Sequence, residues 1–179
     1  MIQPIKEISK LAHSTGAFFM SDCTQAIGKL AVDVDDLGID LMCFSGHKIY
    51  APKGVGGLYI RQSENRIKIS PLLHGGGHEK GMRSGTLNVP GIIALGAACD
   101  LAKKEMSINS KKIKELRDCL ETELLKIDGT SINGSTSQRL FNVSNILFNG
   151  VDSDAMIMSL SNPETNLPLI AVSNGSACT

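Results

Sequence analysis

Hydrophobic positions in the first third of the chain alternate between helical and strand-like spacing. Over residues 3–14, Ile5, Ile8 and Leu11 recur every three residues, which predicts an amphipathic helix. Short apolar runs at residues 17–20 and 40–44 each end in small polar residues, and residues 54–60 begin with glycines; all three predict strands. A helix followed by short buried strands indicates an α/β domain with a parallel sheet.

The remaining pattern predicts more helix and a second group of strands. Residues 66–73 alternate only weakly before a run of glycines at 75–77. Residues 89–106 predict a largely buried helix, and residues 111–127 predict a second, charged helix that ends at Asp128 and Gly129. Strands are expected at 130–132, 143–148 and 169–172, with a helix over 154–160. We therefore place a domain boundary near residue 106.

Composition excludes several functional classes. The formal net charge is zero, with 18 basic and 18 acidic side chains, so no direct binding to nucleic acid is expected. The apolar runs are too short to cross a bilayer, and residues 1–6 lack the features of a signal peptide, so a cytoplasmic protein with no membrane association is expected. Five cysteines without a C-x-x-C pair disfavour a disulfide framework and a structural zinc site.

The most informative segment is the apolar run 41–44 followed by Ser45, Gly46, His47 and Lys48. A hydroxyl and an imidazole on a flexible turn suit a phosphate, and the adjacent lysine supplies a nucleophilic amine. Pyridoxal phosphate, a phosphorylated aldehyde, matches both groups. Asp22 follows an earlier predicted strand, and because functional groups gather at the carboxyl ends of parallel strands, Asp22 and Lys48 are expected to face one pocket.

Two other groups of residues are weaker indications of function. His74, His78 and Glu79 surround the glycine run, which cannot hold the helical i, i+4 geometry of a zinc site, so a structural loop is favoured and no resident metal is predicted. The same region lacks the spacing of a nucleotide-binding P-loop. ATP binding is therefore not expected.

Short motifs along the whole chain, taken together and in order, resemble the pyridoxal-phosphate cysteine desulfurases of the NifS/IscS type. They are Asp22-Cys23-Thr24-Gln25, Ser45-Gly46-His47-Lys48, Gly75-Gly76-Gly77-His78-Glu79, Arg83-Ser84-Gly85-Thr86 and Gly175-Ser176-Ala177-Cys178-Thr179. The resemblance implies a fold-type-I pyridoxal-phosphate transferase. Residues 1–106 would be part of its large cofactor-binding α/β domain, and residues 107–179 part of its small C-terminal α+β domain, ending in the active-site cysteine loop.

The resemblance also implies roles for particular residues. Asp22 matches the aspartate that pairs with the pyridinium nitrogen, and Gln25 the amide that hydrogen-bonds the phenolic oxygen of the cofactor. Ser45 and His47 match phosphate contacts, and Lys48 the lysine that forms the Schiff base. The alternatives are a helix-capping aspartate, a solvated glutamine and an ordinary surface lysine.

Two further matches concern a dimer and sulfur transfer. Thr86 would reach the phosphate in a partner subunit, which makes the active site shared in a homodimer; otherwise it is a helix N-terminal residue. Cys178 matches the nucleophile on a mobile loop, which takes sulfur as a persulfide and could transiently ligate an iron-sulfur cluster. With Lys48 and His47 it forms the implied catalytic set. The four other cysteines are interpreted as small apolar residues without chemistry.

The implied reaction converts L-cysteine and an acceptor thiol into L-alanine and a persulfide, whose sulfur passes to an acceptor or scaffold protein. The alternatives are a selenocysteine lyase or another lyase on the same scaffold, and an inactive module that retains dimer or partner contacts. The resemblance corresponds to only about half of a family member, without its N-terminal and C-terminal segments. We therefore expect a fragment with little activity alone, because a cut sheet exposes strand edges.

Overall fold

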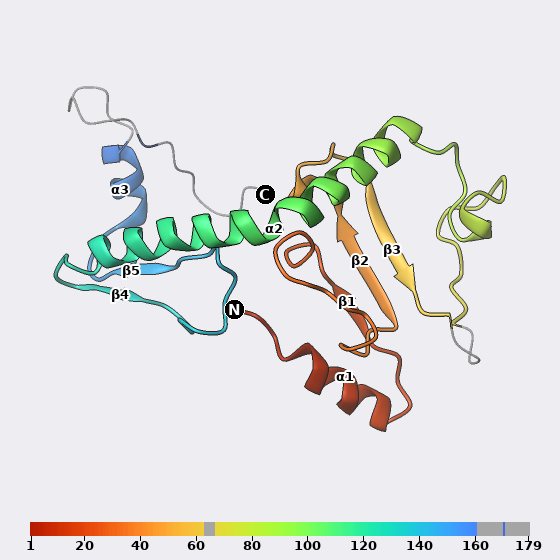
Figure 1. Cartoon of the computed structure of the whole chain (residues 1–179), viewed down its shortest axis with the longest axis horizontal. Coiled ribbons are helices and arrows are strands. Elements are labelled where there is room, and N and C mark those ends of the chain that lie inside the picture. Colours follow the sequence, from red (N-terminus) through yellow and green to blue (C-terminus); the bar gives the residue numbers. More distant parts are fainter. Residues whose placement is uncertain (63–66, 161–169, 171–179) are drawn as a thin grey trace.

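The computed structural model describes residues 1–62, 67–160 and 170. A three-stranded sheet and a two-stranded sheet are joined by one long helix, which crosses the larger sheet and continues to the smaller one (Figure 1). Apart from Ile170, the strand predicted at 169–172 lies outside the described residues, as does the proposed nucleophile Cys178. In the described part, no helix is long and apolar enough to span a membrane.

The larger sheet contains the strands that carry the candidate chemistry. Helix α1 (Ile5–Ser14) precedes β1 (Met20–Asp22), β2 (Leu41–Ser45) and β3 (Gly56–Ile60), which lie in the order β1-β2-β3. β1 and β2 are parallel, as predicted, whereas β3 is antiparallel to β2. The connection from β2 to β3 contains only the short 3-10 helix η1 (Gly46–Ile49) and a turn, too little chain for a parallel crossover.

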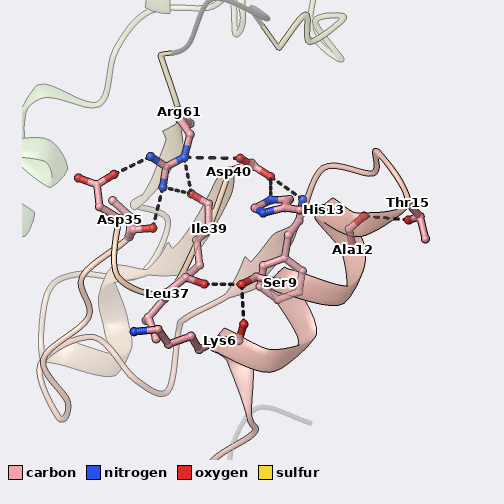
Figure 2. A network of polar contacts seen from close by, with 12 residues as sticks. Lys6, Ser9, Ala12, His13, Thr15, Asp35, Leu37, Ile39, Asp40 and Arg61 are labelled. Atoms are coloured by element: carbon pink, nitrogen blue, oxygen red, sulfur yellow. Dashed lines mark hydrogen bonds and ion pairs between the residues drawn. The ribbon is translucent and has the colours of Figure 1, made fainter.

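A polar network fixes the start of β2, at the far end of the strand from Ser45 (Figure 2). The buried Asp40 carboxylate accepts hydrogen bonds from Phe19 N and His13 Nε2, both at 2.8 Å, and Arg61 Nε lies 3.5 Å away. Burial acts to raise the pKa of Asp40, but these hydrogen bonds and the His13 and Arg61 charges lower it overall. In α1, the Ser9 hydroxyl also donates to Leu37 O at 2.7 Å. These contacts hold α1 and the end of β3 against β2.

The two helices predicted at 89–106 and 111–127 are one helix, α2 (Val89–Leu124), of 36 residues. The Asn88 side chain caps its start by accepting from Gly91 N at 3.1 Å. The prediction of two helices was wrong because residues 107–110 contain no glycine or proline, so nothing in that segment stops helical hydrogen bonding. The helix therefore runs without a break past residue 106.

The second sheet pairs β4 (Thr130–Ile132) with β5 (Ile146–Phe148) in antiparallel register, and α3 (Ser153–Leu160) follows. The strand predicted at 143–148 is shorter than expected, since residues 143–145 belong to the preceding loop. Glu121 of α2 and Arg139 of that loop form a buried bidentate ion pair, with N–O distances of 2.5 and 2.6 Å. This pair fastens the loop to the second half of α2.

Candidate active site

Asp22 is the last residue of β1, and its side chain is exposed at the carboxyl end of the sheet. Thr24 N donates to Asp22 Oδ1 at 2.8 Å. The Thr24 hydroxyl and this backbone N–H lower the pKa of the Asp22 carboxyl, and they outweigh the small opposing effect of burial. Asp22 is therefore ionised at neutral pH.

Ser45 ends β2 on the same edge of the sheet. Its hydroxyl lies 2.6 Å from His47 Nδ1, and its backbone N–H donates to Thr24 Oγ1 at 3.2 Å. The parallel pairing of β1 and β2 extends past Asp22, because Cys23 N donates to Cys43 O at 2.8 Å. The structure thus brings Asp22 and Ser45 to one edge, joined through Thr24.

The turn after Ser45 is held tightly in place. Gly46 is buried, and a Cβ at this position would lie 2.9 Å from Leu95 Cδ1 of α2 and 3.0 Å from Val55 O. Gly46 N donates to Val55 O at 2.9 Å. Only glycine permits this approach without a shift of its neighbours, so the turn that carries His47 and Lys48 packs directly on α2.

Lys48 and Asp22 do not line the same cavity. Lys48 lines a cavity of about 410 Å³ between η1 and the alanine-rich side of α2, whereas Asp22 and Gln25 line a second cavity of about 500 Å³ beside the chain's first residues. The two residues therefore line different cavities in this structure, whereas the sequence predicted that they face one pocket. The reason is the 3-10 geometry of η1: with about three residues per turn, adjacent side chains such as His47 and Lys48 diverge by roughly 120°.

The other residues predicted for the site are Gln25, Thr86 and Cys178. Gln25 is exposed and shares the cavity of Asp22. Thr86 is exposed two residues before Asn88, and Asn88 caps α2, so Thr86 is not the capping residue. Cys178 lies outside the described residues.

Two residues near the site received no role from the sequence. Thr24 joins the ends of β1 and β2, and its position two residues after Asp22 is the spacing at which an aspartate accepts from the backbone. Lys29 lines the cavity of Lys48; burial, then the charge of Lys48, lowers the pKa of Lys29. No pattern in the sequence distinguishes Lys29 from an ordinary surface lysine.

The cysteines other than Cys178 differ in environment. Cys23 is buried, Cys43 and Cys99 are partly buried, and Cys119 is exposed on α2, contrary to the expectation of a buried small residue. Burial, followed by the nearby Asp22 charge and Cys23, raises the pKa of the Cys43 thiol, which disfavours the reactive thiolate. Among the residues that the structure describes, no three His, Cys, Asp or Glu side chains gather as a metal site would require.

The sequence and this geometry together define a class of protein. The model of the aminotransferase class-V family matches residues 1–179, the whole chain, and the chain belongs to that family. Class-V aminotransferases are pyridoxal-phosphate enzymes, and the predicted fold-type-I architecture is confirmed by solved structures of the same kind.

Individual relatives show which members of the family the chain resembles. The chain is 45% identical over 179 residues to the cysteine desulfurase IscS of Edwardsiella ictaluri (strain 93-146), covering all of this chain and 42% of that protein. It is 44% identical to a mitochondrial cysteine desulfurase of Arthroderma benhamiae, of which it covers 34%. A NifS-like protein from Rickettsia africae ESF-5 superposes with a TM-score of 0.81 at 36% identity, covering 88% of this chain and 43% of that one. The chain thus spans less than half the length of these relatives.

The groups at the carboxyl edge of β1 and β2 fit pyridoxal phosphate in part. A protonated ring nitrogen requires an ionised carboxylate, and the hydrogen bonds from Thr24 keep Asp22 in that form. A phosphate requires donors, and the hydroxyl of Ser45, at the end of β2, lies 2.6 Å from the imidazole of His47, in η1. The Asp22 carboxylate, an acceptor, matches the ring N–H of the cofactor, and the Ser45–His47 pair matches its phosphate.

Proposed function

We propose that this chain carries part of the active site of a pyridoxal-phosphate cysteine desulfurase, which acts on L-cysteine and leaves sulfur on a cysteine as a persulfide. One observation carries the proposal: an ionised aspartate and a Ser-His pair share the carboxyl edge of two parallel strands. It is supported by similarity along the whole chain to proteins named cysteine desulfurase. When bound, the cofactor's protonated ring withdraws electrons from the substrate's Cα.

Asp22, Gln25, Ser45 and His47 would bind and orient the cofactor. The Asp22 carboxylate would accept the ring N–H, since its lowered pKa keeps the negative charge in place. The Gln25 amide would donate to the phenolic oxygen from the same cavity. The Ser45–His47 pair would donate to the phosphate: when Ser45 Oγ donates to His47 Nδ1, the imidazole Nε2–H is the donor to phosphate, and when Nδ1–H donates to Oγ, the Ser45 hydroxyl is. Their mutual contact at 2.6 Å limits the rotation of both side chains.

Lys48 and Cys178 would carry the reaction. Lys48 would hold the cofactor covalently through its amine, and the same amine, once the substrate amine has displaced it, would move protons at the substrate's Cα. The Cys178 thiolate would attack the sulfur of the substrate cysteine. A sulfur–sulfur bond forms while the carbon–sulfur bond breaks; the electron pair stays on the substrate carbon, which takes a proton to give L-alanine.

The proposal extends to organisation and partners. Residues 1–106 would belong to a large cofactor-binding domain and residues 107–179 to a small domain, with α2 as a continuous connection between them. A homodimer would let Thr86 approach the phosphate of a partner copy, and a sulfur-acceptor or scaffold protein would receive the sulfur. A cytoplasmic location is part of the proposal, although one relative is described as mitochondrial.

Borohydride trapping tests the function directly. The chain is incubated with pyridoxal phosphate, reduced with borohydride, and analysed by intact mass and by peptide mapping. We expect one stable adduct at Lys48, lost in Lys48→Ala and kept in Lys53→Ala, the exposed lysine of the adjacent turn. Lys29 is the main competitor, because its lowered pKa raises the neutral, reactive fraction. An adduct at Lys29 alone, or no adduct, would contradict the proposal.

A further inference from the structure

The cavity beside Lys48 has a composition that the proposed function does not explain. Its volume of about 410 Å³ is in the usual range of small-molecule sites, and two lysines, Lys29 and Lys48, line it. Glu105 is the one acidic side chain among its lining residues, all of which belong to the described part of the chain. The cavity therefore carries an excess of positive charge, which suits an anion.

A close approach of three segments places the two lysines at this cavity. Gly28 has a φ of 74°, and a Cβ there would lie 2.8 Å from Ile49 Cγ2 in η1 and 3.3 Å from Ala102 Cβ in α2. Glycine thus lets the loop that carries Lys29 reach both elements. Burial, and next the charge of Lys48, lower the pKa of Lys29, so the two ammonium groups repel each other. An anion between them would offset that repulsion.

Beyond this charged end, the wall of the cavity is apolar. α2 contributes residues that recur at three- and four-residue intervals and so share one face of the helix: Ala94, Ala97, Ala98, Leu101 and Ala102. They line roughly 12 Å of helix at 1.5 Å per residue. Glu105 lies past Ala102, away from this stretch. A charged end and an apolar wall of this length suit an anionic head group with a short unbranched chain.

Tyr50 lies at the mouth of the same cavity in a strained conformation. Its side chain lines the cavity, yet the residue is 99% exposed. Its φ of 67° is in the left-handed region, which is uncommon for a bulky residue, and such strain concentrates at functional positions. The ring is not needed for packing of the fold, so it is available to cover a bound apolar chain.

We propose that the cavity between η1 and α2 binds a medium-chain monocarboxylate, with its carboxylate between Lys29 and Lys48 and its hydrocarbon chain along α2 beneath Tyr50. This site is separate from the cavity that Asp22 and Gln25 line. A bound carboxylate would occupy the space beside the Lys48 amine. The consequence for the cofactor rests on the proposed function: the carboxylate and pyridoxal phosphate would compete for this lysine.

Isothermal titration calorimetry of the chain with octanoate measures this binding directly. Acetate carries the same head group without the chain, and 1-octanol carries the chain without the charge, so these two comparisons need no variant. We expect one octanoate to bind saturably, with acetate and 1-octanol each at least about tenfold weaker, because each lacks one half of the contacts. Amide chemical shifts locate the ligand, and they should change over residues 94–102.

Three variants test the two ends of the site. Lys29→Gln removes one charge and should weaken octanoate binding roughly tenfold, while 1-octanol binding stays unchanged. Lys103→Gln is the matched control, because Lys103 is exposed on α2 and does not line the cavity. Ala97→Phe fills the apolar part from an exposed position on the helix, and it should abolish octanoate binding.

The outcomes separate the ligand site from the proposed function. Equal affinity for octanoate and 1-octanol, or for octanoate and acetate, would overturn the proposal, as would equal losses in Lys29→Gln and Lys103→Gln. Octanoate should also slow formation of the borohydride-trapped adduct at Lys48. An adduct that forms at the same rate with and without saturating octanoate would refute the placement of the carboxylate beside Lys48. Absence of the adduct without octanoate would refute the proposed function, while the measured octanoate affinity would still support the ligand site.

Discussion

The buried ion pair between Glu121 and Arg139 allows a quantitative test of what holds the second sheet to α2. Both side chains are almost fully buried, at 6% and 8% exposure, and they share two hydrogen bonds. Glu121→Ala removes the acceptor and leaves a buried guanidinium without its charge partner. Breaking a buried pair in this way costs about 3–5 kcal/mol of the free energy of unfolding.

The matched control lies one half-turn along the same helix. Glu123 pairs with Lys126 in water, with both side chains more than half exposed, at 61% and 64%. Glu123→Ala makes the same chemical change on the same helix, and an exposed i, i+3 pair contributes roughly 0.3–0.5 kcal/mol. Urea unfolding followed by circular dichroism measures both. A loss below about 1 kcal/mol for Glu121→Ala would refute the argument that burial makes this pair matter.

The pH dependence gives the same test a second readout. The hydrogen bonds from Arg139 lower the pKa of Glu121 below its usual value of 4.5, against the opposing effect of burial. A carboxyl with a lowered folded-state pKa stabilises the fold above its unfolded-state pKa, and that contribution is lost as the pH falls through the folded-state pKa. The stability difference between wild type and Glu121→Ala should be constant above about pH 5.5 and shrink at more acid pH. A difference independent of pH down to acid unfolding would contradict the ion-pair explanation.

Three further changes test the site and its support. Gly46→Ala should destabilise the chain by about 1–3 kcal/mol in urea unfolding, since the added Cβ would lie 2.9 Å from Leu95; an unchanged midpoint would show that the turn relaxes freely. Asn88→Ala should cost about 1 kcal/mol through loss of the α2 cap, and Asn88→Ser should recover most of it. In a chain that turns over substrate, Cys178→Ala should abolish persulfide formation from L-cysteine, whereas surviving turnover of selenocysteine would favour the lyase alternative.

Local signals in the sequence were sufficient for the strand ends but not for the direction of side chains in the turn. The apolar runs before Asp22 and Ser45 predict that both residues lie at strand ends, and parallel pairing brings them together. The direction of Lys48 depends on the 3-10 geometry of η1, which the hydrophobic pattern does not specify. The antiparallel β3 follows from a connection after β2 that is too short for a parallel crossover.

The sequence pattern also could not predict the long-range ion pairs. On α2, Leu116 and Leu120 are 61% and 53% exposed, whereas Glu121 is buried. Helical periodicity assumes that apolar positions point to the core, but it cannot identify a distant arginine that makes burial of a glutamate favourable. Asp40 is a similar case, since its partners His13 and Arg61 come from other elements.

The separation of Lys48 from Asp22 bears on how the site would work. Asp22 and Ser45 are positioned by backbone pairing and by Thr24, all within the sheet, so their arrangement depends on few distant contacts. Lys48 is carried by η1, which packs on α2 where a Cβ on Gly46 would lie 2.9 Å from Leu95, and on the loop after β1 where a Cβ on Gly28 would lie 2.8 Å from Ile49. Lys48 and Asp22 line different cavities in this structure, so a ligand that bonds to Lys48 and also pairs with Asp22 requires a change at one of these side chains. Cofactor binding should therefore rotate the Lys48 side chain while leaving the Asp22–Thr24–Ser45 connection unchanged.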